Sequence, residues 1–381
     1  MAKSIELIPF NKPYFNGKEI DYFKNSLASG KISGDGIFTK KCQDFFQDEY
    51  GFNSSFLTTS CTDALEMSSL LLDINAGDEI ILPSYTFVST ANPFLLRGAK
   101  LIFADSGKDN PNICPKSIAK LISKKTKAVV VVHYAGIACD IDTIKEIIKG
   151  SNIILIEDAA QAFDSYYKGK PLGTFGMFST FSFHETKNIT CGEGGLLVVN
   201  DSKYLKKAEI IREKGTNRSA FLKGEVDKYG WVDIGSSFLP SDILAALLYS
   251  QLNNKNKIQS RRIKLWQYYF KKLVHLQKVD LITLPIIPDY ASNNAHMFYI
   301  VLKTEKIRDR ILSGLRSNGI SAAFHYQSLH KSKYFLKNNI LEDLPMADKY
   351  SSCLLRLPLF YELKFKSIDL IVEIINTELN K

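Results

Sequence analysis

The sequence lacks most features that mark secreted, membrane or metal-binding proteins. Cysteine is scarce, with six among 381 residues, and there is no CxxC pair. We expect no disulfide framework, and we interpret the cysteines as small buried hydrophobic residues rather than metal or redox ligands. No segment approaches the roughly 18 uncharged apolar residues that a membrane span needs. The first ten residues contain no apolar signal core, so we expect a soluble, cytoplasmic protein.

Basic residues are in excess but form no block. The formal net charge is +9, from 49 lysines and arginines against 40 aspartates and glutamates. Pairs such as Lys124-Lys125 and Lys271-Lys272 are typical of solvated helix ends. A basic surface suits a small polyanionic substrate. Nucleic-acid binding would need a clustered basic face, which the sequence does not show.

Short apolar segments alternate with helical patterns over the first two hundred residues. The expected strands cover residues 55–59, 79–82, 100–103, 128–132, 153–156 and 196–199, and the expected helices cover 18–27, 39–50, 61–72, 87–96, 116–122, 141–148 and 203–212. This alternation predicts an α/β fold with a mainly parallel sheet that helices cover on both faces. Ligands then bind at the carboxyl ends of the strands.

The remainder of the chain predicts a second, smaller unit. Residues 215–235 show no clear period, and residues 242–275 read as one long helix. Beyond Pro288 the pattern restarts as a small α+β unit, with strands at 298–302 and 322–325, a helix at 307–317 and C-terminal helices. We expect residues 1–250 to form an extended arm (1–15) and the large ligand-binding domain. Residues 251–381 should form the linking helix and the small domain.

One stretch, residues 153–195, concentrates the groups that indicate catalysis. It opens as an apolar run ending in Glu157-Asp158, passes through a glycine-punctuated loop, and reaches FSFHETK and GEGG. A carboxylate ending a buried strand, followed by one lysine among aromatic residues and glycines, suits an amine that condenses with a carbonyl cofactor. We interpret Lys187 as the lysine that condenses with pyridoxal phosphate (PLP), and Asp158 as the acid facing its pyridinium nitrogen. A solvated lysine and an acid that caps the next turn are the alternatives.

Other segments contain residues that suit the phosphate, the ring face and the phenolic oxygen of such a cofactor. A strand runs into a helix at Ser60, where free N–H groups and the hydroxyls of Ser60 and Thr62 suit a phosphate, with Ser182 as a further hydroxyl donor. Phe87 could stack on the ring, and Gln161 could contact the phenolic oxygen. The alternative for the segment at Ser60 is a plain helix cap, and the alternative for Phe87 is an aromatic residue of the hydrophobic core.

Taken together, several segments resemble the DegT/StrS family of sugar aminotransferases. They are EDAAQ, FSFHETKN and GEGG, with PSYTFVSTAN and VHYAG upstream, and the resemblance covers nearly the whole chain, from Ile8 to Leu359. A closer similarity, to members that aminate a dTDP-linked 4-keto-deoxyhexose, is carried by SGDGIFTKKCQ, SCTDALEMSSLLLDI, IIREKGTNRS, VDKYGWVDIGSS, NAHMFYI and FHYQSLH. The resemblance implies the type I fold of PLP-dependent aminotransferases and a homodimer with active sites at the interface.

The resemblance also implies the cofactor contacts. It places Lys187 on the cofactor's aldehyde, Asp158 at the ring nitrogen, Gln161 near the phenolate, Phe87 on the ring face, and Thr62, the Asp63 backbone and Ser182 at the phosphate. One segment departs from the family pattern, because Gly235-Ser236-Ser237-Phe238-Leu239 stands where many members have a GYNYR-like segment. There a serine, Ser237 or its neighbour, would replace the asparagine that reaches the partner subunit's phosphate. Some members have a histidine in place of the lysine and are dehydratases, so Lys187 favours transamination.

For the substrate, the resemblance implies a dTDP-sugar acceptor and L-glutamate as donor. The residues that lie where family members contact nucleotide and sugar are Lys214, Arg218, Lys228, Tyr229, His325 and Tyr326. Arg218 and Lys228 suit a diphosphate, although an ordinary charged surface loop is the alternative. Amination at C3 of the sugar, and a non-catalytic protein that binds PLP or sugar nucleotide, are the competing functions.

Overall fold

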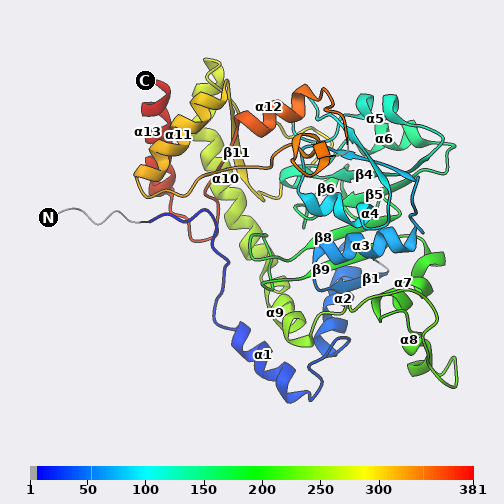
Figure 1. Cartoon of the computed structure of the whole chain (residues 1–381). Coiled ribbons are helices and arrows are strands. Elements are labelled where there is room, and N and C mark those ends of the chain that lie inside the picture. Colours follow the sequence, from blue (N-terminus) through cyan, green and yellow to red (C-terminus); the bar gives the residue numbers. More distant parts are fainter. Residues whose placement is uncertain (1–6, 53, 338) are drawn as a thin grey trace.

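The computed structural model of the chain describes residues 7–52, 54–337 and 339–381. The first part of the predicted arm, residues 1–6, lies outside them. Residues 7–15 form no helix, and Ile8 makes a parallel bridge to Ile320. Figure 1 shows a large sheet with its helices, a smaller sheet beside the C-terminal helices, and the long helix α10 running between the two parts.

The large sheet is mixed, with a parallel centre. Its strands are β1 (Ser55–Thr58), β2 (Glu79–Pro83), β3 (Lys100–Ala104), β4 (Thr126–Val132), β5 (Ile154–Asp158), β8 (Phe178–Ser182) and β9 (Gly195–Val199). Their order is β1-β9-β8-β5-β4-β2-β3, and pairing is parallel from β8 to β3, whereas β9 runs antiparallel to both of its neighbours. The predicted α/β fold with a mainly parallel sheet is confirmed.

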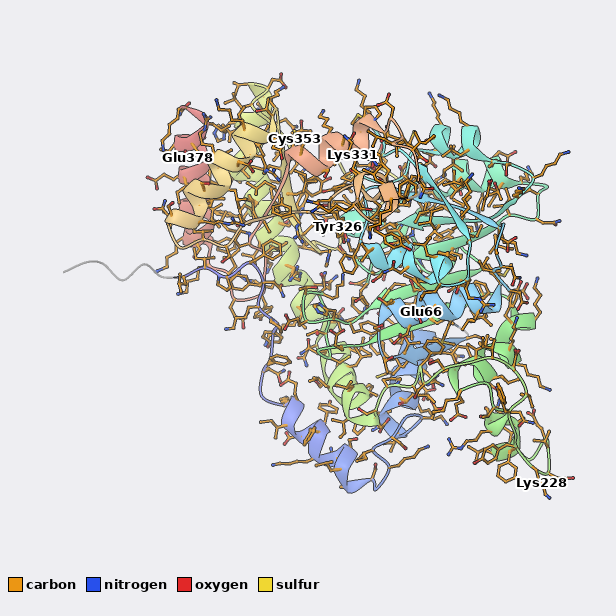
Figure 2. All side chains as sticks on the ribbon, viewed as in Figure 1. Glu66, Lys228, Tyr326, Lys331, Cys353 and Glu378 are labelled. Atoms are coloured by element: carbon orange, nitrogen blue, oxygen red, sulfur yellow. The ribbon has the colours of Figure 1, made fainter. Side chains whose placement is uncertain are left out.

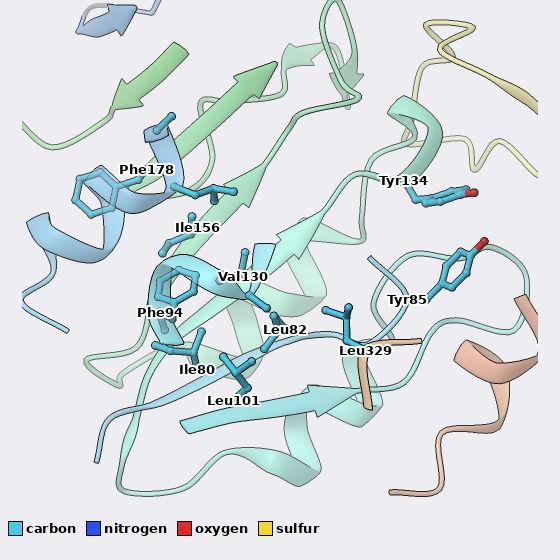
Figure 3. Close-up of a cluster of buried hydrophobic side chains, with 14 of the residues drawn as sticks. Ile80, Leu82, Tyr85, Phe94, Leu101, Val130, Tyr134, Ile156, Phe178 and Leu329 are labelled. Carbon is cyan, nitrogen blue, oxygen red and sulfur yellow. The ribbon is translucent and has the colours of Figure 1, made fainter. Parts of the chain in front are cut away.

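Both faces of this sheet are covered. The helices are α1 (Glu19–Ala28), α2 (Ile37–Tyr50), α3 (Cys61–Leu71), α4 (Asn92–Leu95), α5 (Pro115–Leu121), α6 (Ile141–Ile148), α7 (Leu205–Arg212), α8 (Arg218–Leu222) and α9 (Asp242–Leu252). Val130 and Ile156 face α3, α4 and α7, and Figure 3 shows this core with Phe94 and Phe178. Their neighbours along the strands face α2, α5, α6 and α9. Central strands buried on both faces explain why their sequences read as continuous apolar runs.

The small sheet is antiparallel throughout. Its strands are β10 (Ile282–Thr283), β11 (Phe298–Leu302), β12 (Ala323–Phe324) and β13 (Leu354–Leu357), in the order β10-β11-β13-β12. Its helices are α10 (Lys255–Lys278), α11 (Glu305–Ser317), α12 (Pro345–Cys353) and α13 (Phe365–Leu379). Leu355 and Leu357 pack with α10, α11 and α13, whereas Leu354 packs into the core on the large-sheet side. The two faces of β13 therefore meet different layers.

The shorter elements complete the chain. The hairpin strands are β6 (Tyr166–Tyr167) and β7 (Lys170–Pro171), and the 3-10 helices are η1 (Val88–Thr90), η2 (Tyr134–Gly136), η3 (Ser202–Tyr204), η4 (Leu329–Lys331) and η5 (Phe335–Lys337). Within the part of the chain that is described, no helix is both long enough and apolar enough to cross a membrane.

Several predicted elements differ from those observed. The long helix predicted over 242–275 breaks at Asn253-Asn254, where α9 ends and α10 begins. Asparagine side chains compete with the helix for backbone groups, which favours helix ends at these positions. The helix predicted over 87–96 is η1 followed by α4, whose first turn contains Pro93. Strand β8 was not predicted, and the segment 215–235 contains α8. The domain division at residue 250 stays a prediction.

Candidate active site

A cavity of about 700 Å³ opens at the carboxyl ends of the large sheet's strands. Asp158 at the end of β5, Ser182 at the end of β8, and Lys187 beyond it line one side. The segment 324–326 and Arg356, which belong to the small-sheet unit, line the other. The cavity thus lies where parallel strands are expected to present a ligand site.

Asp158 is held in place by neighbouring hydrogen-bond donors. Its side chain is buried; Oδ2 accepts a hydrogen bond from Thr90 Oγ1 at 2.7 Å, and Oδ1 accepts one from the backbone N–H of Ala160 at 3.1 Å. One oxygen therefore caps the following turn, while the residue also lines the cavity. Burial raises the pKa of Asp158, against the lowering effects of Thr90, Ala160 and Lys187. A cation in front of this carboxylate would restore the ionised form.

The residue before it, Glu157, fixes the end of strand β5 from inside the protein. Its oxygens accept hydrogen bonds from His133 Nε2, the backbone N–H groups of Gly173, Phe175 and Gly176, and Ser179 Oγ. His133 Nδ1 accepts from the N–H of Cys139 at 3.1 Å, so the ring proton lies on Nε2 and points at Glu157. Burial opposes ionisation of Glu157, but the bonds from His133 and the glycines outweigh it and lower its pKa.

Lys187 lies in the turn that follows β8. Its backbone N–H donates to His184 O at 2.9 Å, and the next residue, Asn188, donates to Gln259 Oε1 and Asn294 O, both at 2.8 Å. Burial lowers the pKa of Lys187, and the nearby acid Asp158 acts in the opposite direction. Among the residues that the structure describes, Lys187 Nζ has no hydrogen-bond or ion-pair partner. It faces the cavity as an amine that is more easily deprotonated than a surface lysine.

The amino end of helix α3 lies at the cavity wall. Ser60 caps it, with Oγ accepting from the N–H of Asp63 at 3.1 Å, and the hydroxyl of Thr62 donates to Ser89 Oγ at 2.8 Å. The first N–H groups of the helix have no partner within it. Gly195 of β9 lets the strand approach closely, because a Cβ there would lie 2.3 Å from the Ser60 carbonyl. Hydroxyls and N–H groups therefore converge on one part of the cavity.

Asp63 itself is turned away from this site. Its backbone N–H is engaged by Ser60, and its carboxylate accepts from the hydroxyl of Thr59. Asp63 is not among the residues that line the cavity. Of the predicted phosphate contacts, Thr62 and Ser182 therefore line the cavity, whereas Asp63 does not.

Hydrogen bonds at and beside the cavity join the two units. Gln161 accepts from the N–H of Ala135 at 2.6 Å and donates to Tyr326 Oη at 3.0 Å. Tyr134 Oη and His325 Nδ1 are 2.7 Å apart. Tyr326 has φ +34°, a backbone conformation that is rare outside glycine and is common at functional sites.

The ring of Phe87 lies at the mouth rather than in the core. Its side chain is 55% exposed and its ring centroid lies 6.1 Å from that of Tyr326. The alternative reading of Phe87 as a core aromatic is therefore wrong. His184, also at the mouth, contacts Thr186 Oγ1 at 3.0 Å and lies 3.5 Å from a Glu193 oxygen.

The remaining predicted substrate residues lie outside this cavity. They are Lys214, Arg218, Lys228 and Tyr229, and Ser237, which was predicted for the partner subunit's phosphate, lies outside as well; all five are exposed on the described surface. Arg218 donates to Glu213 Oε1 at 2.8 Å, and Tyr229 packs on Phe221. Figure 2 shows Lys228 at the edge of the molecule, far from Tyr326. Within one chain, this loop does not reach the cavity.

Ser89, Thr90, His296 and Arg356 are among the cavity-lining residues that sequence reasoning missed. Ser89 and Thr90 lie within the PSYTFVSTAN segment, whose many hydroxyl side chains could have indicated a polar binding site. Arg356 is the single polar residue in the apolar strand Leu354–Leu357, and such an exception usually marks a functional position. His296 had no local signal, because its contact to Asn188 Oδ1 joins distant segments.

The residues present fit pyridoxal phosphate. A half-buried lysine without a polar partner among the described residues, a buried acid at a strand end, and a helix amino end with hydroxyls are the chemistry that its aldehyde, ring nitrogen and phosphate require. With the type I arrangement of the sheet, they define a PLP-dependent aminotransferase fold.

Comparison with known proteins gives the family. The chain belongs to the DegT/DnrJ/EryC1/StrS aminotransferase family, whose sequence profile matches residues 13–376. Its cofactor is pyridoxal phosphate.

Solved structures agree with this membership over nearly the full length. The aminotransferase TlmJ from Streptoalloteichus hindustanus is 26% identical with a TM-score of 0.90, covering 98% of this chain and 99% of that one. The putative sugar aminotransferase Spr1654 from Streptococcus pneumoniae, in its PMP form, is 25% identical with a TM-score of 0.91, covering 98% and 99%. Helicobacter pylori PseC, an aminotransferase involved in the biosynthesis of pseudoaminic acid, is 25% identical with a TM-score of 0.89, covering 98% and 100%.

Proposed function

We propose that this protein transfers the amino group of L-glutamate to C4 of dTDP-4-keto-6-deoxyglucose. The products are 2-oxoglutarate and dTDP-4-amino-4,6-dideoxygalactose, the sugar nucleotide used for enterobacterial common antigen. The amine and the carbonyl oxygen are exchanged between the two substrates, so the reaction is redox-neutral overall. The observation that supports transamination most directly is the Lys187 amine, which has no polar partner in the described part of the chain and lines one cavity together with the buried Asp158.

Lys187 is the proposed proton carrier. When bound, PLP supplies an aldehyde that takes up amines and a ring that accepts electron density from the reacting carbon. A lysine whose pKa burial lowers can hold a proton at Nζ or release it without a large free-energy cost. Lys187 would thus remove a proton from one carbon and deliver it to another.

Asp158 and the end of helix α3 would hold the cofactor. The carboxylate of Asp158 would face the ring nitrogen and keep it protonated, with its orientation fixed by Thr90 and Ala160. The N–H groups at the start of α3, with the hydroxyls of Thr62 and Ser182, would bind the phosphate. Phe87 would cover the ring, and Gln161 would approach its phenolic oxygen.

His325 and Tyr326 would contact the sugar from the opposite wall, since both line the cavity. Lys214, Arg218, Lys228, Tyr229 and Ser237 would serve the cavity of a second copy, because they lie on the outside of their own chain. This arrangement requires a homodimer. Large apolar side chains are exposed on α1 and on the segment 231–234, among them Phe23 at 45% and Trp231 at 84%, which favours such an interface.

The test is incubation of the PLP-loaded protein with L-glutamate and dTDP-4-keto-6-deoxyglucose, with the product identified by NMR. We expect 2-oxoglutarate and an axial amine at C4. A 3-amino product from a 3-keto substrate would establish the competing regiochemistry. Failure of glutamate to bleach the bound cofactor's colour would favour the non-catalytic alternative.

A further inference from the structure

His296 lies on the cavity wall, in the segment that leads into β11, and is half-buried. Its backbone N–H donates to Asn294 Oδ1 at 2.9 Å, and its carbonyl accepts from Nη2 of the buried Arg262 at 2.7 Å. Asn294 in turn donates to the carbonyls of Gln161 and Phe163 at 2.8 and 2.9 Å. These bonds tie the segment of His296 to the large-sheet unit and fix where its ring lies along the cavity.

The two ring nitrogens of His296 differ in what lies beside them. Nδ1 lies 2.9 Å from Asn188 Oδ1. The amide of Asn188 cannot be turned round, because its NH₂ group donates at 2.8 Å to the carbonyl of Asn294, which can only accept. An amide oxygen also only accepts, so Nδ1 carries the ring proton and donates it to Asn188. Nε2 is left with a lone pair and has no hydrogen-bond partner among the described residues.

The ring of His296 is also neutral. Burial lowers its pKa well below the ordinary value of 6.5, and the positive charges of Lys187, Arg262 and Arg356 lower it further. At neutral pH Nε2 therefore carries no proton and can only accept a hydrogen bond. Among these charges Lys187 has the largest effect, which places the acceptor close to the reacting amine.

An acceptor without a proton distinguishes among the groups of the proposed substrates. The carboxylates of glutamate, the diphosphate and the keto oxygen only accept hydrogen bonds, so none of them can pair with Nε2. The amine of glutamate is the group that reacts with the cofactor. The remaining donors are the hydroxyls of the two sugars and the N–H of the base, and those on the nucleoside lie beyond the diphosphate, far from the reacting C4. The hydroxyl on C3 is adjacent to C4 and therefore suits an acceptor near Lys187.

We propose that His296 Nε2, held as an acceptor by Asn188, binds the C3 hydroxyl of the sugar substrate. This inference rests on the proposed function, and it makes His296 a specificity-determining residue and Asn188 a positioning residue. Glutamate has no hydroxyl for Nε2 to bind. Loss of the acceptor should therefore weaken the half-reaction with the sugar and leave the half-reaction with glutamate unchanged.

The experiment measures binding of dTDP-4-keto-6-deoxyglucose to the PLP-loaded protein by calorimetry, without an amino donor, so that no turnover occurs. His296→Phe keeps a flat ring without the acceptor, and its Kd should rise about 3- to 10-fold, the loss typical of one uncharged hydrogen bond. The 3-deoxy analogue of the sugar nucleotide should bind the wild type more weakly by the same factor, and should bind His296→Phe and the wild type equally. His296→Gln, whose Oε1 can take the place of Nε2, should recover part of the preference for the hydroxyl. The rate at which glutamate bleaches the cofactor should stay within about twofold of wild type in both variants.

His275→Phe is the matched control, because His275 lies exposed on α10 in the same unit. It should bind both sugar nucleotides as the wild type does. Equal affinity of the wild type for the parent sugar and the 3-deoxy analogue would overturn the proposal. Equal losses for both sugars in His296→Phe would also overturn it, since they would indicate a purely structural wall residue.

Two further outcomes separate the parts of the argument. Nitrogen NMR of histidine-labelled protein should show the ring proton of His296 on Nδ1, and a proton on Nε2 would overturn the proposal. If the wild type prefers the parent sugar over the 3-deoxy analogue but does not aminate it when glutamate is added, the proposed function fails while the hydroxyl subsite stands.

Discussion

Replacing Glu157 by glutamine tests how the active-site strand is held. The change keeps the size of the side chain but replaces one acceptor oxygen by an NH₂ group. Placed at the Oε2 position, that NH₂ would face the N–H of Gly173 and the ring proton of His133. Placed at Oε1, it would face the N–H groups of Phe175 and Gly176, and also the hydroxyl of Ser179, which can turn to accept from it. In either orientation two buried donors lose their acceptor.

The expected cost follows from that count. Each buried donor left without an acceptor costs about 1–3 kcal/mol, so Glu157→Gln should lower the free energy of unfolding by about 2–6 kcal/mol. His133 cannot avoid this loss by moving its ring proton from Nε2 to Nδ1, because Nδ1 already accepts a hydrogen bond from the N–H of Cys139. Urea-induced unfolding followed by circular dichroism measures this loss. Glu146→Gln on the solvent-facing side of α6, where the side chain is 72% exposed, is the control and should unfold at the wild-type urea concentration.

The same residue predicts a pH dependence. The pKa of Glu157 is lower in the folded protein than its ordinary value of 4.5. Its stabilising contribution should be complete above about pH 4.5 and should be lost as the pH falls through the lower folded value. The stability gap between wild type and Glu157→Gln should therefore shrink in acid. Coincident unfolding curves at pH 7 would refute the reasoning about this hydrogen-bond cluster.

Three further substitutions test the cofactor site. Lys187→Ala should abolish turnover with glutamate, and any measurable transamination by it would exclude the proposed proton carrier. Asp158→Asn keeps the shape and the bond from Ala160, and the Thr90 hydroxyl can turn to accept from the new NH₂, but the charge is lost; kcat should therefore fall by about 10²–10³ with little change in unfolding, and a rate near wild type would contradict the assignment. Gly195→Ala places a Cβ 2.3 Å from the Ser60 carbonyl, so PLP affinity measured by fluorescence titration should drop, whereas Gly230→Ala, with open space around it, should bind PLP normally.

The strand that ends at Asp158 could be predicted because its environment is uniform. A central parallel strand buried on both faces reads as a continuous apolar run, and the acid pair Glu157-Asp158 after it marks the strand end. Strand β8 could not be predicted in the same way. Three of the five residues in its sequence FSTFS are polar, and the buried Ser179 has its acceptor in Glu157. That partner lies 22 residues away, outside any local pattern.

The residues of the candidate site likewise fall into two groups, those that the local sequence indicates and those that only the folded chain places. Lys187, Asp158 and the start of α3 are each marked by local sequence, and the structure brings them to one cavity. The orientation of Arg356 depends on strand pairing with Tyr299 and Ala323, which only the folded sheet defines. The roles of Lys228 and its neighbours depend on a second copy, so neither the sequence nor one chain decides them.

The cavity has walls that belong to two different sheets. The wall with Asp158 and Lys187 is fixed by hydrogen bonds within the large sheet and its turns. The wall with Tyr326 and Arg356 is carried by the short strands β12 and β13 and the segment beside them. Substitutions on the second wall can therefore diversify which molecules descendants of this chain admit, while the chemistry inherited on the first wall stays unchanged.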